Sequence, residues 1–304
     1  MSYVKISEVS KTEYKKIFEE YGYASGNIYP WHDLIGETNG VKYLRVSYRG
    51  EHVLDILAFA RTPEILMELY YRCPVYNQKN IGRIRGADQL KTRAEIWGAV
   101  SKYIKSNDLN ISYHIRNFDN LDLRPYMWSN FFVKIKYTAL SKIKNHYEAM
   151  RPVRRQEVGY AKSRENLRIG GIHSDSAKKK LKTFLRENLK ELKSSEYVVH
   201  DETIDFIAEL EGASFVCCEN NLGEIAALAL LLKPGDKYMY LAYIHSRKNF
   251  KYATACLQSH LINLCASENL QLDTLGANSP KLADAKASYG LIPNAYFEIT
   301  SHGR

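Results

Sequence analysis

The sequence predicts an α/β protein of the α+β type, with two domains that each contain a mixed, mostly antiparallel sheet flanked by helices. Its 304 residues exceed what one hydrophobic core usually serves and fit two domains of about 150 residues. Hydrophobic residues make up 45% and charged residues 25% of the chain, an ordinary globular composition. Helical and alternating apolar patterns follow one another in a similar order in both halves. We expect one domain at 1–137 and a second at 138–304.

The patterns of the first half predict helices and strands in turn. Ser10 followed by Glu13 is typical of a helix N-terminus closed by a capping box. Arg49 and Gly50 separate two alternating runs and predict a hairpin turn. The expected helices are 10–21, 63–71 and 88–106, and the expected strands are 41–48, 52–60, 111–115 and 131–137.

The second half shows clearer patterns. Pro152 must start or kink a helix within 142–164, and Asn220 with Asn221 predicts a hairpin. Strict alternation along 237–244 places Tyr240 and Tyr243 on opposite faces of a strand. Further helices are expected at 175–193, from 201 onward, at 249–269 and at 280–289, and strands at 214–219, 223–232, 237–244, 270–275 and 296–300.

The sequence lacks the motifs of several classes of function. The sequence contains no zinc-binding pattern, P-loop or GxGxxG turn, so we expect no metal and no permanently bound cofactor. The five cysteines form no CxxC pair, which favours reduced thiols over a disulfide framework. The longest apolar stretch, 225–232, is far shorter than the roughly 20 residues of a membrane span. The polar, charged first 16 residues contain no apolar signal segment, which favours a cytoplasmic location.

Positive charge is concentrated in one segment. The formal net charge is +9, and the segment 134–193 contains 17 Lys or Arg against 6 Asp or Glu. Such a surface favours an anionic partner, such as a phosphate, a nucleotide or RNA. It is equally consistent with a solvated helix face that only aids solubility.

Three local features are candidates for a site. Arg151, Arg154 and Arg155 lie within one turn of a predicted helix, where guanidinium groups bind phosphate or carboxylate. The alternative is salt bridging with nearby glutamates. The end of the strand 237–244 can hold an oxygen atom with exposed backbone groups. After the loop 276–280, Lys286 can stabilise a negative charge, or it is an ordinary exposed helix lysine.

The second half resembles the Fem-type (FemABX) peptidyltransferases of the GNAT-like acyltransferase superfamily. The residues Met150–Lys162, MRPVRRQEVGYAK, are similar to the arginine-rich R-x-x-I-R-K-A helix of that family. Segments 223–230 (GEIAALAL) and 238–243 (YMYLAY) follow. The pair LGANSP at 275–280 and AKASYG at 285–290 resembles G-x-N…F-K-x-x-F-G. The resemblance covers about residues 138 to 300, and the first half matches only in the order of its elements.

This resemblance implies two GNAT-like domains, the first of them degenerate, and an enzyme that transfers an acyl or aminoacyl group to an amine. In the bacterial Fem enzymes the donor is aminoacyl-tRNA and the acceptor is a peptidoglycan precursor. Arg151, Arg154 and Arg155 carry over as substrate-binding residues and Lys286 as a catalytic residue. Ala285 replaces the family's phenylalanine, and the long helical hairpin arm of the Fem enzymes is absent.

The remaining roles follow from the acyltransferase topology. The donor would bind where the strand 237–244 ends and the next helix begins, with Arg247, Lys251 and Asn278 as contacts. Tyr243, His245 or the substrate itself would accept the proton of the amine. The usual acetyl-CoA loop pattern is missing after Arg247. Two other hypotheses therefore stay open: an acyl-CoA-dependent N-acetyltransferase, and a non-catalytic protein that binds RNA or another anion.

Overall fold

The computed structural model describes most of the chain and divides it into two compact units. The described residues are 3–22, 40–60, 75–81, 88–116, 122–141, 146–171, 175–191, 205, 208, 213–233 and 237–301. Among them, unit 1 contains residues 3–136 and 295–301, and unit 2 contains residues 137–294. Two strands, β6 (Phe132–Leu140) and β12 (Ile292–Thr300), contribute residues to both units. We predicted two independent domains that meet after residue 137. The two compact units do not test whether each part is an independent domain, so this boundary stays a prediction.

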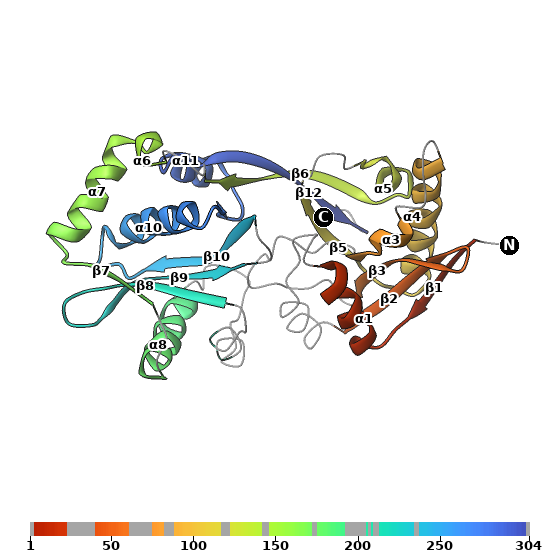
Figure 1. The fold of residues 1–304 in the computed structure, drawn as a ribbon, viewed down its shortest axis with the longest axis horizontal. Coiled ribbons are helices and arrows are strands. Elements are labelled where there is room, and N and C mark those ends of the chain that lie inside the picture. Colours follow the sequence, from red (N-terminus) through yellow and green to blue (C-terminus); the bar gives the residue numbers. More distant parts are fainter. Residues whose placement is uncertain are drawn as a thin grey trace. The chain divides into compact units, whose positions relative to one another are not determined.

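Unit 1 contains an antiparallel sheet with the strand order β1-β2-β3-β4 (Figure 1). Its strands are β1 (Val4–Glu8), β2 (Val41–Tyr48), β3 (Glu51–Phe59) and β4 (Val75–Tyr76). A further strand, β5 (Ser112–Arg116), pairs with β12 in antiparallel fashion. The helical elements are α1 (Lys11–Ile17), η1 (Phe18–Gly22), α3 (Gln78–Ile81), α4 (Asp88–Ser106) and α5 (Arg124–Trp128).

Local sequence explains the elements of unit 1. Ser10 and Glu13 form the predicted capping box of α1, because each side chain accepts the other's backbone N–H. The hairpin between β2 and β3 turns at Arg49 and Gly50, both with positive φ. Helix α4 buries Ile96 and Val100 against the same core as β2 and β3. Trp97 packs there with its ring centroid 4.5 Å from that of Tyr126.

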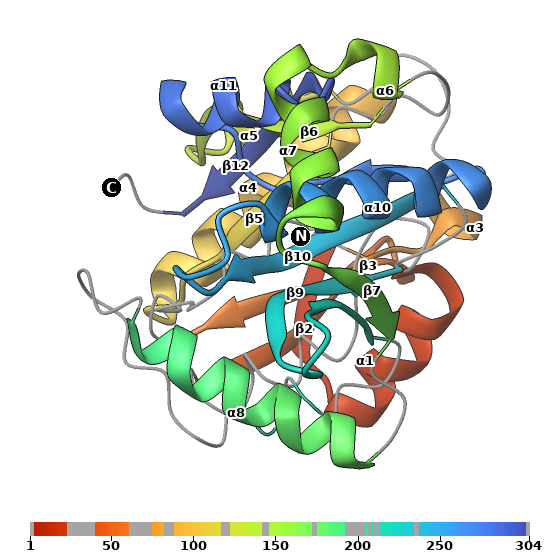
Figure 2. The same cartoon turned by 90° about the vertical axis from the view of Figure 1, so that its left-hand side faces the viewer.

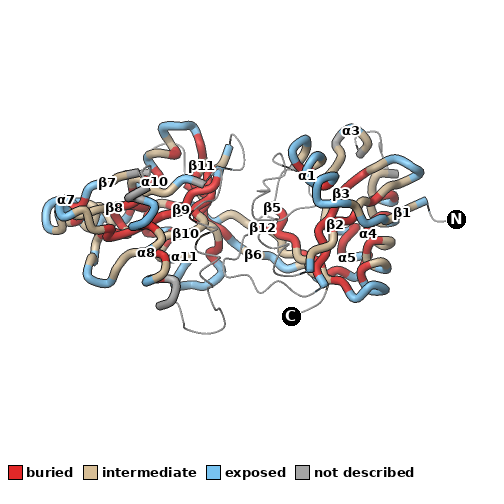
Figure 3. Tube along the Cα trace, turned by 90° about the horizontal axis from the view of Figure 1, so that it is seen from below, coloured by how far each residue is buried: buried red, intermediate tan, exposed pale blue. Residues whose placement is uncertain are grey.

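The strands of unit 2 follow the order β6-β11-β10-β9-β8-β7. They are β7 (Arg168–Gly171), β8 (Ala213–Glu219), β9 (Ile225–Leu232), β10 (Tyr238–Ser246) and β11 (Gln271–Asp273), besides the end of β6. All eight residues of β9 are buried, as expected for a central strand that is covered on both faces (Figure 3). Among the described strand pairs of this unit, β10 and β11 alone are parallel, so the predicted mixed, mostly antiparallel sheet is confirmed.

Helices cover both faces of this sheet. Figures 1 and 2 show α10 (Ala253–Ser267) along one face and α8 (Asp175–Glu191) along the other. Helix α7 (Pro152–Ser163) packs on α10, and two short helices, α6 (His146–Ala149) and α11 (Pro280–Ala287), complete the unit. No helix in the described part of the chain is long and apolar enough to cross a membrane. Cys217, Cys218, Cys256 and Cys265 are free, buried thiols, as predicted.

Most of the predicted elements are present, with shifted ends. The predicted helix 142–164 contains a break before Pro152, and the helix predicted from Asn249 starts at Ala253. Strands β1 and β7 and helix α5 were not expected, because each is only four or five residues long and shows no clear period. The predicted helix 63–71, Cys73 and nearly all of the helix predicted from 201 lie outside the described residues.

A β-bulge changes the facing of β10. Leu241 pairs with Leu231 and Tyr243 pairs with Leu230, so Ala242 is the extra residue. Tyr240 and Tyr243 consequently lie opposite Leu232 and Leu230, two positions that share one face of β9. The prediction that the two tyrosines lie on opposite faces is wrong, because strict alternation does not anticipate a bulge.

Candidate functional site

A cavity of about 300 Å³ lies within unit 2, between β10, α7, α10 and α11. Its size is at the lower end of the range of small-molecule sites. It is lined by Arg154, Glu157, Leu241, Ile244, Lys251, Thr254, Ala255, Gln258, Thr274, Leu282, Ala285, Lys286 and Tyr289. Most of this surface is apolar, and the polar groups come from α7, α10, α11 and the segments beside them.

The cavity opens where two parallel strands part. β10 and β11 pair only from Tyr240 back to Tyr238, and β11 ends at Asp273, opposite Tyr240. β10 continues to Ser246, with its bulge directly beyond the last pair. Leu241 and Ile244, the first residues beyond the pairing on this face, line the cavity. Beyond Tyr240 this edge of β10 therefore presents backbone N–H and C=O groups that no longer face a paired strand.

Lys286 is the central buried charge of the site. Its side chain is on α11, and the residue is 8% exposed. The ammonium donates to the carbonyl oxygens of Thr274 (2.7 Å), Leu275 (2.5 Å) and Gly276. Burial lowers the pKa of Lys286 to about 8, so the group is mostly protonated at neutral pH. The alternative of an exposed helix lysine is therefore wrong.

The three carbonyl groups belong to an unusual turn after β11. Leu275 and Gly276 both have positive φ, +46° and +67°, a region that non-glycine residues adopt at a cost. The buried Asp273 carboxylate accepts the Leu275 N–H at 2.9 Å and the Thr138 hydroxyl. Asp273 and Lys286 thus hold this turn from two sides, and the three donors of the ammonium are directed to the turn rather than to the cavity.

The three arginines predicted to bind substrate lie in different surroundings. Arg154 lines the cavity, donating to the Ser288 hydroxyl (2.9 Å) and the Glu157 carboxylate (2.6 Å). Its guanidinium lies 5.1 Å from the centroid of the Tyr289 ring. Salt bridging with a nearby glutamate, the alternative considered for this cluster, is therefore present at Arg154.

The other two arginines have different partners. Arg151 precedes the first turn of α7 and forms an exposed ion pair with Asp284, at 2.5 Å. Arg155 donates to the carbonyl oxygens of Tyr147 and Glu148 at the end of α6. Neither lines the cavity, so the structure brings only one of the three arginines to it.

The two predicted proton acceptors lie on the other face of the sheet. Tyr243 and His245 follow Tyr240 on the face away from Leu241 and Ile244. The His245 ring contacts Phe184 of α8 edge-on, with a centroid distance of 6.4 Å. Burial raises the pKa of Tyr243, which disfavours the phenolate that a base requires. The sheet therefore separates both residues from Lys286 and the cavity.

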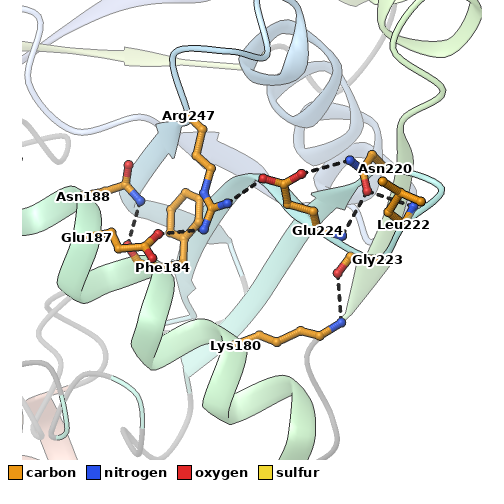
Figure 4. Close-up of polar contacts among 9 residues, drawn as sticks. All are labelled: Lys180, Phe184, Glu187, Asn188, Asn220, Leu222, Gly223, Glu224 and Arg247. Atoms are coloured by element: carbon orange, nitrogen blue, oxygen red, sulfur yellow. Dashed lines mark hydrogen bonds and ion pairs between the residues drawn. The ribbon is translucent and has the colours of Figure 1, made fainter.

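Arg247 also lies on the α8 side. Figure 4 shows its guanidinium between Glu224 and Glu187, with both N–O distances at 2.7 Å. It lies over the Phe184 ring, 5.7 Å from the centroid. These contacts connect α8 to the β8–β9 hairpin, so Arg247 has a structural partner on each side and does not line the cavity.

Of the last two residues predicted to contact the acyl donor, one lines the cavity and the other does not. Lys251 is exposed and lines the cavity from the turn just before α10. The Asn278 side chain instead accepts the backbone N–H of Tyr137 at 2.7 Å and anchors the loop before α11. Sequence reasoning missed Gln258 and Glu157 as lining residues. Their helical spacing gave no signal, because a cavity between four elements has no pattern in sequence.

Comparison with known proteins supports the fold through structure alone. No protein-family model matches the sequence, and no curated protein is similar enough in sequence to match it. The solved structures of FemX and of L-PGS from Bacillus licheniformis both superimpose with a TM-score of 0.60, at 14% and 11% identity. The alignments cover 97% and 96% of this chain, and 96% and 92% of theirs.

A tandem GNAT protein from the clavulanic acid biosynthesis pathway is similar over 99% of both chains, with a TM-score of 0.53 and 11% identity. At such low identity the similarity concerns the fold only. The chain therefore has a tandem GNAT-like fold, as the resemblance of its second half implied.

Proposed function

We propose that the chain is a Fem-like transferase that moves an acyl or aminoacyl group from an activated donor to an amine. The cavity of unit 2 would hold the reacting carbonyl of the donor. The observation that carries this proposal is the separation of β10 from β11 directly above the cavity. Parted strands leave backbone groups available inside a largely apolar, sheltered space.

The edge of β10 supports the chemistry. An amine that attacks the donor carbonyl places a negative charge on its oxygen, and backbone N–H groups stabilise such a charge when they are fixed in advance. Leu241 and Ile244, on either side of the bulge, line the cavity where the strand has left its parallel partner. The amine then loses a proton, and the bond to the leaving alcohol or thiol breaks. Positioning and charge stabilisation, rather than a covalent nucleophile, would supply the rate.

The charges around the cavity favour an anionic donor. Of the described residues that line it, Arg154, Lys251 and Lys286 are basic and Glu157 alone is acidic. This excess of positive charge attracts phosphate groups, which both acyl-CoA and aminoacyl-tRNA carry. The similar tandem GNAT protein is described with reference to acetyl-CoA, whereas the Fem resemblance points to aminoacyl-tRNA. A peptidoglycan precursor is the acceptor that this resemblance favours.

A thermal-shift comparison tests the proposal. The wild type, Arg154→Gln and a control, Lys178→Gln on the exposed part of α8, are heated with acetyl-CoA, longer acyl-CoAs and charged tRNA. A donor at 100 times its Kd stabilises the folded state by about 2.7 kcal/mol. We expect one donor class to stabilise the wild type and the control, and Arg154→Gln to bind it about tenfold more weakly. If neither donor class stabilises the wild type, the proposal is wrong.

The anion-binding alternative predicts a different result. Lys178, Lys179 and Lys180 are all exposed on α8, on the face opposite the cavity. If these lysines bind RNA, affinity falls steeply with salt and Lys178→Gln weakens it. RNA binding of this kind, without stabilisation by any acyl donor, would favour the alternative.

A further inference from the structure

Two buried polar side chains on the cavity wall have no hydrogen-bond partner within the described part of the chain. Gln258 of α10 is 6% exposed, and Tyr289, just after α11, is 5% exposed. Both line the cavity. The Gln258 carboxamide can donate two hydrogen bonds and accept two, and the Tyr289 hydroxyl can donate one and accept one.

The neighbouring polar groups are already used by the protein. The Thr254 hydroxyl donates to Ser246 at 2.7 Å, and the Thr274 hydroxyl donates to the Ala139 carbonyl at 3.0 Å. Lys286 donates to three carbonyl groups of its own turn. The Gln258 and Tyr289 groups therefore differ from these neighbours in having hydrogen-bonding capacity left for a ligand.

Packing alone does not explain either group. Neither residue has an atom among the fully enclosed, unpartnered polar atoms of the described residues, so both groups reach the space of the cavity, where an apolar side chain of similar size would offer no hydrogen bond. The motif that 285–290 resembles has phenylalanine where this chain has Tyr289. A phenylalanine ring would still lie under Arg154, so the hydroxyl adds only its hydrogen-bonding capacity. Burial raises the pKa of Tyr289 to about 12, which keeps the hydroxyl protonated and able to donate.

We propose that Gln258 and Tyr289 bind an uncharged polar group, a hydroxyl or a carboxamide, on the acyl group that the donor delivers. The cavity would thereby select polar acyl groups over plain alkyl ones. This inference rests on the proposed function, since it concerns the specificity of the same site.

The surroundings favour an uncharged group of more than two carbons. A buried charge needs an opposite charge nearby, but Lys286 is directed to its carbonyl groups and Arg154 is paired with Glu157. Leu241, Ile244 and other apolar residues form the rest of the wall. The cavity volume of about 300 Å³ is the volume that about ten water molecules occupy in liquid water. An acetyl group would fill only part of it.

Small neutral fragments test the site without assuming a donor. Butyramide and 2-pentanone have nearly the same shape, but only the amide donates hydrogen bonds. NMR titration measures both dissociation constants for the wild type, Gln258→Met, Tyr289→Phe and a control, Tyr147→Phe. Tyr147 is 49% exposed and does not line the cavity. We expect the wild type and the control to prefer butyramide at least fivefold, and the two cavity variants to lose most of this preference. Tyr289→Phe keeps the ring and its packing, so the test stands even if Gln258→Met does not fold.

A second arm separates this inference from the proposed function. Binding of 3-hydroxybutyryl-CoA is compared with that of butyryl-CoA in the same four proteins. An unchanged fragment preference in both cavity variants, or no preference in the wild type, overturns the inference even if acyl donors bind. A preference that both variants lose supports the inference even if neither thioester binds, and only the proposed donor class then fails.

Discussion

Replacing Lys286 with methionine tests how the turn beside the cavity is held. Methionine keeps the length of the side chain and removes its charge. Three hydrogen bonds from the ammonium are lost, each worth about 2 kcal/mol for a charged donor. Removing the buried charge returns part of this, because the fall in pKa from 10.5 to about 8 corresponds to about 3 kcal/mol. We expect a net loss of about 3 kcal/mol in the free energy of unfolding.

Urea denaturation of the wild type, Lys286→Met and Lys281→Met measures this loss. Lys281 is an exposed lysine on the same helix, and its replacement should change the free energy of unfolding by less than about 0.5 kcal/mol. A Lys286→Met protein as stable as the control variant would refute the reasoning, because the turn would then hold without the ammonium. A stable but inactive variant would instead assign Lys286 a direct part in the reaction.

The same variant carries a pH signature. The folded pKa of Lys286, about 8, lies below the unfolded value of 10.5. Between these two pH values the unfolded chain binds more protons than the folded one, so the free energy of unfolding rises with pH. The wild type should therefore gain up to about 3 kcal/mol between pH 8 and pH 10.5 relative to Lys286→Met. Parallel pH profiles of the two proteins would show that the lysine is not buried as described.

Two further predictions concern stability. Gly290 has a φ of +75°, and a Cβ atom there would lie 2.8 Å from Ala149 Cβ, so Gly290→Ala should cost about 2 kcal/mol or more. Gly159, inside α7 with open space around it, is the matched control, and Gly159→Ala should raise stability by about 1 kcal/mol in thermal unfolding. The hydrogen bond from His114 lowers the pKa of Glu298 to about 2. The ionised Glu298 therefore contributes its full share to the free energy of unfolding above pH 4.5, and this share is lost as the pH falls toward 2. Glu298→Gln should remove about 2 kcal/mol of this acid-sensitive stability, and equal acid titrations of the two proteins would contradict it.

The sequence predicted the order of the elements because hydrophobic periodicity and turn residues report on local structure. The capping box at Ser10, the turn at Arg49 and the buried strand β9 are all of this kind. Such patterns could not predict which side chains of β10 lie on which face of the sheet. The extra residue at Ala242 moves every later side chain of the strand to the opposite face. A bulge depends on the partner strands, and its sequence signal is weak.

The candidate site shows the same limit more sharply. Arg151, Arg154 and Arg155 are indistinguishable in sequence, yet only Arg154 reaches the cavity. What separates them is the end of α6 and the position of Asp284 on α11, which are properties of tertiary packing. Lys286 was found through a motif, but its burial was not predictable from a helix pattern that also suits an exposed lysine.

The separation of Lys286 from Tyr243 and His245 also narrows the chemistry of the proposed transfer. A proton acceptor must come within hydrogen-bond reach of the attacking amine, and these two residues face α8 on the other side of the sheet. Among the described lining residues, Glu157 is the only carboxylate, and it already accepts a hydrogen bond from the Arg154 guanidinium at 2.6 Å. An amine that enters the cavity already deprotonated, and that transfers its second proton to the leaving group, needs no such residue. The proposed reaction should then follow the ionisation of the acceptor amine, with a rate that rises with pH up to the amine's own pKa and that changes little in His245→Gln.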